Sequence, residues 1–192
     1  MKNVSAVILA GGLSTRMGVC KAELRWKNTT LLEHQIEKMR SLGIEDIIVS
    51  GYMTTVPGTR CVPDTYPLKG PLGGIHAGLS AAKYPHCLVT GIDTPLVPEK
   101  TLAELVAAHM ESGSDITVLS HGDEVEPLIG VYKSRLSGEA ERILKCDNTS
   151  VRVLLKRART GLYEYKGDSE LLCDCNTPED ILSAQTCELT HG

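Results

Sequence analysis

The sequence has 192 residues, 42% of them hydrophobic, and a formal net charge of -4 at pH 7. This length and composition predict one domain over residues 1–192, while the negative charge and the lack of Lys/Arg runs argue against a nucleic-acid surface and favour a small partner. The chain shows no signal peptide and no run of about 18 apolar residues, and its 7 cysteines include no C-x-x-C pair, so we expect a soluble cytoplasmic protein with no membrane contact.

A β-branched segment, Val4–Leu9, predicts a buried first strand, and a glycine-rich basic loop follows it. Gly11 and Gly12 let backbone amides approach a phosphate, and Arg16 and Lys21 add positive charge. The loop has neither the Lys-Ser/Thr of a P-loop nor a G-x-G-x-x-G, so another kind of nucleotide site is indicated. The alternative is a tight turn whose glycines only permit positive φ and whose cations are solvated.

Alternating strands and helices are predicted after this loop. The further expected strands are Asp46–Ser50, Arg60–Pro63, Cys87–Ile92, Ile116–Ser120 and Leu128–Tyr132. The expected helices are one capped by Thr29 or Thr30 with Leu32, Ile36 and Met39 on one face before Gly43, one over Ile75–Ala82, and one opened by Pro98 with Leu102, Leu105, Val106 and Met110 on one face before Gly113. This alternation predicts a doubly wound, mostly parallel sheet in a three-layer α/β/α fold, with ligands at the carboxyl ends of the strands.

A second glycine-dense segment, Gly70–Ile75, is predicted to be a turn before the helix that follows. Its backbone can lie flat against a ligand, because three of its residues lack a side chain. The alternative is a tight βα loop without a ligand.

Asp93 is predicted to stand at the carboxyl end of a buried strand, followed by Thr94 and Pro95. One carboxylate in this position is typical of nucleotide sites that hold Mg²⁺, with water and substrate phosphate as the other ligands. The alternative is that Asp93 caps the next turn.

The C-terminal part contains two further motifs. Glu126 and Pro127 directly precede the expected strand Leu128–Tyr132. Asn176 precedes a predicted helix start in which Thr177 is the N-cap and Asp180 the capping-box acid. The C-x-C pair upstream of Asn176 lacks the four ligands of a structural zinc site.

These motifs together resemble the molybdenum cofactor guanylyltransferases (the molybdopterin-guanine dinucleotide biosynthesis protein A family) of the nucleotidylyltransferase superfamily. The first loop reads L-A-G-G-x-x-x-R-M-G-x-x-K from Leu9 to Lys21, and it is followed in the family's order by Asp64, G-P-L-G-G, D-T-P, E-P-L-I and N-T-P-E-D. The resemblance implies a Rossmann-like nucleotidyltransferase fold and transfer of GMP from GTP to the phosphate of molybdopterin or the molybdenum cofactor, with release of pyrophosphate. It also implies Mg²⁺ as the cofactor, and protein partners in molybdenum insertion and molybdoenzyme maturation.

The resemblance assigns a role to individual residues. The implied catalytic residues are Arg16, Lys21 and Asp93, and Asp93 is also the implied metal ligand. The implied nucleotide-binding residues are Leu9, Ala10, Gly11, Gly12, Lys21, Ser50, Asp64, Gly70, Pro71, Leu72, Gly73 and Asp93. The implied acceptor-binding residues are Glu126, Pro127 and Asn176.

The sequence departs from the family pattern at several positions. Cys20 stands where the family usually has Asp, Ser50 where Asn is common, Glu126 where His is usual, and Leu128 where Thr is usual. A CTP-dependent or sugar-phosphate nucleotidylyltransferase and a non-catalytic nucleotide-binding module therefore stay open as alternatives, while L-A-G-G together with G-P-L-G-G favours GTP.

Overall fold

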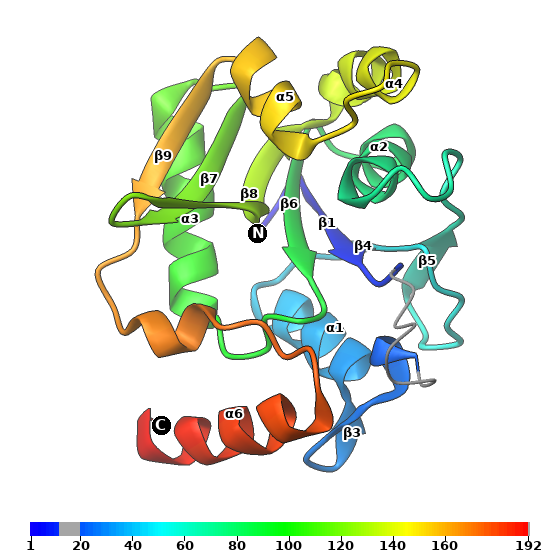
Figure 1. The fold of residues 1–192 in the computed structure, drawn as a ribbon. Coiled ribbons are helices and arrows are strands. Elements are labelled where there is room, and N and C mark those ends of the chain that lie inside the picture. Colours follow the sequence, from blue (N-terminus) through cyan, green and yellow to red (C-terminus); the bar gives the residue numbers. More distant parts are fainter. Residues whose placement is uncertain (12–19, 192) are drawn as a thin grey trace.

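The computed structural model describes residues 1–11 and 20–191. Its centre is a seven-stranded sheet in the order β5-β4-β1-β6-β8-β7-β9 (Figure 1). The strands are β1 (Val4–Leu9), β4 (Asp46–Ser50), β5 (Thr59–Val62), β6 (His86–Gly91), β7 (Ile116–His121), β8 (Glu124–Lys133) and β9 (Thr160–Glu164). β8 runs antiparallel to both neighbours, and the other pairs are parallel. The predicted mostly parallel α/β sheet is confirmed.

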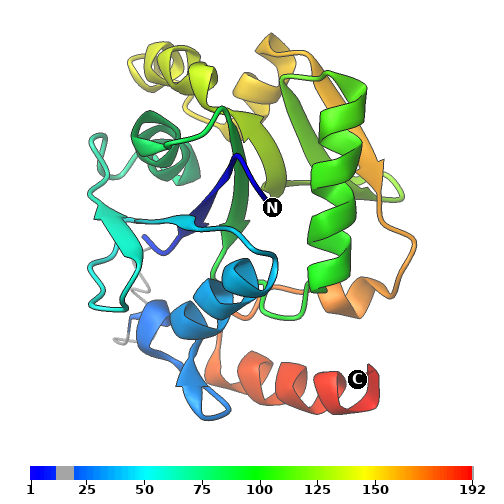
Figure 2. The same cartoon turned by 180° about the vertical axis from the view of Figure 1, so that it is seen from behind.

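Helices cover both faces of the sheet, as the two opposite views show (Figures 1 and 2). The helices are α1 (Leu31–Ser41), α2 (Pro71–Ala81), α3 (Glu99–Ser112), α4 (Ser137–Leu144), α5 (Val151–Arg157) and α6 (Pro178–His191), with short 3-10 turns at η1 (Lys21–Glu23), η2 (Ser134–Leu136) and η3 (Ser169–Leu172). Apolar residues of α1 and α3 belong to one core cluster, and those of α2, α4 and α5 to a second. In the part of the chain that is described, no helix is long and apolar enough to cross a bilayer.

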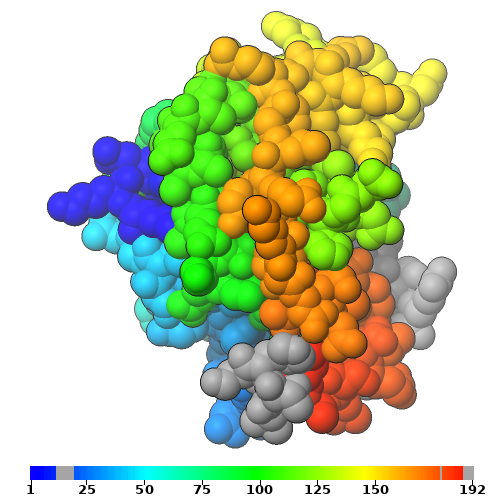
Figure 3. Space-filling view, turned by 90° about the vertical axis from the view of Figure 1, so that its left-hand side faces the viewer, coloured from blue at the N-terminus to red at the C-terminus, as the bar shows by residue number. Residues whose placement is uncertain are grey.

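A third, smaller apolar cluster lies between α6 and the segments near the start of α1, at the bottom of Figure 1. There α6 packs on the two-stranded hairpin of β2 (Arg25–Trp26) and β3 (Thr29–Thr30), with Trp26, Leu31 and Ile181 buried together. Neither this hairpin nor β9 was predicted, because two-residue strands and an edge strand carry little sequence pattern. On the face shown in Figure 3, α3 lies beside β9, and Tyr163 Oη donates to Glu104 Oε2 at 2.7 Å.

The predicted helix caps are largely found. Thr30 Oγ1 accepts from the N–H of Glu33 at 3.2 Å, and the Glu33 carboxylate accepts from the N–H of Thr30 at 2.8 Å, which is a capping box at the start of α1. Gly113, with φ of +64°, ends α3. Met110 of α3 is 43% exposed, so its predicted place on the apolar face was wrong: the buried stripe runs through His109 instead.

The glycine-dense segment is a helix start rather than a turn before one. Gly70 is the N-cap of α2 with φ of +72°, and Pro71 is the first helical residue. The later glycines bring the helix close to β1: a methyl group at Gly78 would lie 2.2 Å from Val7 Cγ1, and one at Gly74 would lie 3.1 Å from Leu9 Cδ2. The sequence pattern indicated loop glycines, whereas close helix–sheet packing is their role here.

β8 also differs from its prediction, since it begins at Glu124 and therefore includes Glu126 and Pro127. Its register against β7 shifts between Val118 and Leu119, opposite the part of β8 that contains Pro127. Proline has no N–H for the ladder, which is the physical reason for an irregularity at this position.

Candidate nucleotide-binding site

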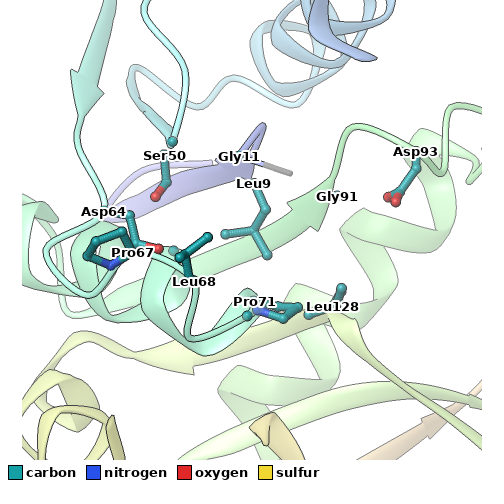
Figure 4. A pocket seen from close by; sticks show the side chains of 13 residues that line it. Leu9, Gly11, Ser50, Asp64, Pro67, Leu68, Pro71, Gly91, Asp93 and Leu128 are labelled. Atoms are coloured by element: carbon teal, nitrogen blue, oxygen red, sulfur yellow. The ribbon is translucent and has the colours of Figure 1, made fainter. Parts of the chain in front are cut away.

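An open cavity of about 680 Å³ lies at the carboxyl ends of β1, β4 and β6, next to the first turn of α2 (Figure 4). The predicted site residues that line it are Leu9, Gly11, Ser50, Asp64, Gly70, Pro71 and Asp93. The lining also includes Gly51, Pro67, Leu68, Gly74, Gly91 and Leu128, which had not been assigned to the nucleotide. This volume is typical of a small-molecule pocket.

The first residues after β1 and after β4 form one wall of the cavity. The N–H groups of Ala10 and Gly11 both donate to the carbonyl oxygen of Ser50, at 2.9 and 3.0 Å. Gly51 has φ of +82°, and a methyl group there would lie 2.5 Å from Gly11 Cα. Only glycine permits this approach, so the wall is bare backbone that a flat ligand can contact.

The hydroxyl of Ser50 is buried and has no hydrogen-bond partner among the described residues. Ser50 is 1% exposed and lines the cavity. A buried hydroxyl without a partner is costly, and a polar ligand atom would satisfy it. The Ser50 position is therefore chemically suited to a bound polar molecule.

Asp64 is placed by the glycines of α2. A methyl group at Gly73 would lie 2.6 Å from both carboxylate oxygens of Asp64, so a side chain at position 73 would force the Asp64 carboxylate to shift. Asp64 Oδ1 accepts from the N–H of Tyr66 at 2.8 Å, which fixes the carboxylate beside the N-terminal turn of α2. Leu72 was also predicted to bind the nucleotide, but its side chain is fully buried in the second core cluster.

At the other end of the cavity, three predicted site residues meet. Lys21 Nζ lies 3.3 Å from Asp93 Oδ2 and donates to Asn176 Oδ1 at 2.6 Å. The N–H of Cys175 donates to the carbonyl oxygen of Asp93 at 2.7 Å, which joins the C-terminal segment to the end of β6. The Lys21 and Asp93 side chains are 19% and 27% exposed, so both remain accessible to a ligand.

Two buried polar residues of α1 hold the backbone around Asp93, and neither was predicted. Gln35 Nε2 donates to the carbonyl oxygens of Gly91 and Thr94 at 3.0 and 3.1 Å. Lys38 Nζ donates to the carbonyl oxygens of Pro95 and Val97 at 2.6 and 2.8 Å. The signal was present in the sequence, because both polar residues interrupt the apolar face of the expected helix.

Asp174, in the segment before α6, adds negative charge near Asp93, and Glu126 near the start of β8 adds negative charge near Asp174. Burial, together with Asp174 and Glu124, raises the pKa of Glu126 above its usual value, although Arg152 lowers it. Burial and the nearby Asp93 likewise raise the pKa of Asp174. Pro127 accepts a hydrogen bond from the Tyr132 hydroxyl through its carbonyl oxygen.

The donor set around Asp93 fits a hard divalent cation only in combination with a ligand. Within residues 1–11 and 20–191, no group of three His, Cys, Asp or Glu side chains converges on a cation position. Asp93 would supply one oxygen, and phosphate and water would have to supply the others, as is usual for Mg²⁺ with nucleotides. Gly12 and Arg16 lie outside the described residues, so their predicted roles stay predictions.

The mostly parallel sheet has a glycine-walled cavity at its carboxyl edge, with a carboxylate at the end of one strand and a lysine beside it. This arrangement is typical of nucleotide-binding α/β proteins. Residues 6–161 match the family model of the MobA-like NTP transferase domain. The chain therefore belongs to this family and is a nucleotidyltransferase, as its motifs indicated.

Individual relatives agree with this assignment. The chain is 33% identical to the molybdenum cofactor guanylyltransferase of Rhizobium meliloti (strain 1021), covering 94% of this chain and 89% of the relative. It is 32% identical to the probable molybdenum cofactor guanylyltransferase of Pelotomaculum thermopropionicum, covering 96% and 93%. The crystal structure of molybdopterin-guanine dinucleotide biosynthesis protein A from Archaeoglobus fulgidus superposes with a TM-score of 0.80 at 26% identity, covering 97% of this chain and 99% of that one.

Proposed function

We propose that this protein transfers GMP from GTP to the terminal phosphate of molybdopterin and releases pyrophosphate. The observation that carries the proposal is the arrangement of one cavity, with Asp64 beside α2 at one end and Asp93 at the other (Figure 4). Lys21 Nζ lies 3.3 Å from Asp93 Oδ2. A nucleotide also has two chemically different ends: the base needs hydrogen-bond acceptors or donors, and the triphosphate needs cations. The family membership supports the same activity.

The base end suits guanine. Asp64 presents a carboxylate at the cavity, and the Watson–Crick edge of guanine offers two adjacent N–H groups to such an acceptor. Cytosine offers one exocyclic amine on that edge. The Ser50 hydroxyl, which has no partner among the described residues, is a further hydrogen-bonding group for the nucleoside.

The phosphate end performs the chemistry by holding and neutralising charge. A phosphate oxygen of the acceptor attacks the α-phosphorus in line, and the bond to the bridging oxygen breaks with its electron pair leaving on pyrophosphate. Lys21 donates to the phosphates of the leaving group, and Arg16 is proposed to do the same. Asp93 would hold Mg²⁺, which supplies further neutralisation of phosphate charge when bound.

The acceptor is proposed to enter along the start of β8. Glu126 and Pro127 directly precede Leu128 of β8, which lines the cavity, and Asn176 Oδ1 accepts from Lys21 Nζ, the partner of Asp93. Asn176 would thereby connect the acceptor position with the cation that holds the nucleotide.

The test is a nucleotide panel. Thermal unfolding would be followed with GTP, CTP, ATP and UTP, each with Mg²⁺, because a ligand at about 100 times its Kd adds about 2.7 kcal/mol to stability. We expect GTP to give the largest shift, and pyrophosphate release to require both GTP and molybdopterin. A larger shift with CTP, or no turnover with molybdopterin and any nucleotide, would contradict the proposal.

A further inference from the structure

Leu68, in the cavity lining, combines high exposure with a left-handed backbone, and the stability of the fold does not explain this combination. Its side chain is 85% exposed although it lines the cavity, and its φ is +66° (Figure 4). Side chains with a β-carbon are disfavoured in this left-handed region, where glycine or asparagine is usual. An exposed leucine gains little from burial that could offset this conformation.

The conformation is imposed by neighbours that anchor the loop. The N–H of Tyr66 donates to Asp64 Oδ1 at 2.8 Å, and the Tyr66 hydroxyl donates to Glu141 Oε1 of α4 at 2.9 Å. The N–H of Lys69 donates back to the carbonyl oxygen of Tyr66 at 3.4 Å. The loop is therefore held on both sides of Leu68, and backbone strain maintained in this way is typical of ligand sites.

We propose that Leu68 contacts the face of the purine base and determines how tightly the base is held. The inference rests on the proposed function, since it places the base at the Asp64 end of the cavity. Asp64 and Leu68 belong to the same anchored loop, so one reads the edge of the base and the other covers its apolar face. The cavity supplies further apolar lining from Leu9 and Pro71.

The expected effect is a loss of base affinity without a loss of phosphate affinity. Covering part of one leucine side chain with a base corresponds to about a five- to tenfold change in Kd. Inorganic tripolyphosphate has no base and should bind equally well with or without the Leu68 side chain.

Three substitutions separate the side chain from the backbone. Leu68→Gly and Leu68→Asn remove the apolar side chain but tolerate the left-handed backbone, so the fold should keep or gain thermal stability. Leu68→Met keeps an apolar side chain and should therefore keep the GTP affinity of the wild type. Leu162→Ala is the control, because Leu162 is also exposed, at 61%, but lies on β9 at the far edge of the sheet.

Kd values for GTP and for tripolyphosphate would be measured by calorimetry on each variant of the full chain. The inference predicts weaker GTP binding in the Gly and Asn variants only, with unchanged tripolyphosphate binding in all of them. Equal GTP affinity in wild type and Leu68→Gly would overturn the inference and leave the proposed function standing. A parallel loss of tripolyphosphate affinity would overturn it as well, since Leu68 would then act on the phosphate end. Failure of the wild-type protein to bind GTP would overturn the proposed function itself.

Discussion

Gln35→Leu tests whether α1 positions the Asp93 carboxylate, for which a catalytic role is proposed. Gln35 is 1% exposed and donates to the carbonyl oxygens of Gly91 and Thr94, which flank Asp93 in the chain. Leucine has a similar volume and keeps the helix, but both carbonyls lose their donor. Two lost hydrogen bonds at about 1 kcal/mol each, increased by the cost of unpaired buried carbonyls, predict a loss of about 2–4 kcal/mol in unfolding free energy.

The same substitution should slow turnover more than it weakens GTP binding. The Asp93 carboxylate would keep its charge but lose its fixed position, and small displacements of a catalytic group cost on the order of tenfold or more in kcat. Urea unfolding and steady-state kinetics on the folded variant measure the two effects separately. A variant that loses stability but retains wild-type kcat would refute the positioning role and leave Gln35 as a packing residue.

The other predictions concern single groups. Asp93→Asn should fold normally and lose at least about 100-fold in Mg²⁺-dependent turnover, because the amide keeps the shape and removes the charge; near wild-type turnover would reduce Asp93 to a turn cap. Alkylation of Cys20 by iodoacetamide should be slowed by GTP with Mg²⁺, while the exposed Cys146 serves as the internal control in the same peptide map. Burial of His109, with His86 and Lys133 beside it, lowers the pKa of His109 to about 4, against the opposing effect of Asp115. The unfolded chain therefore binds this proton first as pH falls, so stability should drop by about 3 kcal/mol between pH 6.5 and pH 4, and His109→Gln should lack that part of the drop in urea titrations.

Elements whose pattern is local were predicted well. The predicted strands Val4–Leu9 and Asp46–Ser50 coincide with β1 and β4, because continuous apolar runs bounded by turn residues are typical of strands buried on both faces. The capping boxes at Thr30 and Thr177 were predictable for the same reason: Thr177 Oγ1 accepts from the N–H of Asp180 at 3.1 Å, and the Asp180 carboxylate accepts from the N–H of Thr177 at 2.7 Å.

Features that depend on tertiary contacts were not predictable in this way. Whether a glycine serves a turn or a close approach depends on what faces it, and Gly73 and Gly74 face Asp64 and Leu9. The direction of β8 likewise depends on its partners, since an apolar run reads the same in both directions. The motifs could predict Lys21 and Asn176 as site residues, but the sequence could not predict that they meet. The two residues are 155 positions apart, and the fold brings Lys21 Nζ to 2.6 Å from Asn176 Oδ1.

The position of Asn176 follows from contacts outside the matched domain. The match to the family model ends at residue 161, and the segment beyond it supplies both Asn176 and the N–H of Cys175 that donates to the carbonyl oxygen of Asp93. This segment is fixed from both sides: Asp180 accepts from the N–H of Asn176 at 2.8 Å, and α6 packs through Ile181 on the hairpin that follows η1. Since η1 begins at Lys21, one apolar cluster holds both partners of the Lys21–Asn176 hydrogen bond in place. The C-terminal helix therefore helps to build the proposed phosphate end of the site, and the seven-stranded sheet alone would leave Lys21 without this partner.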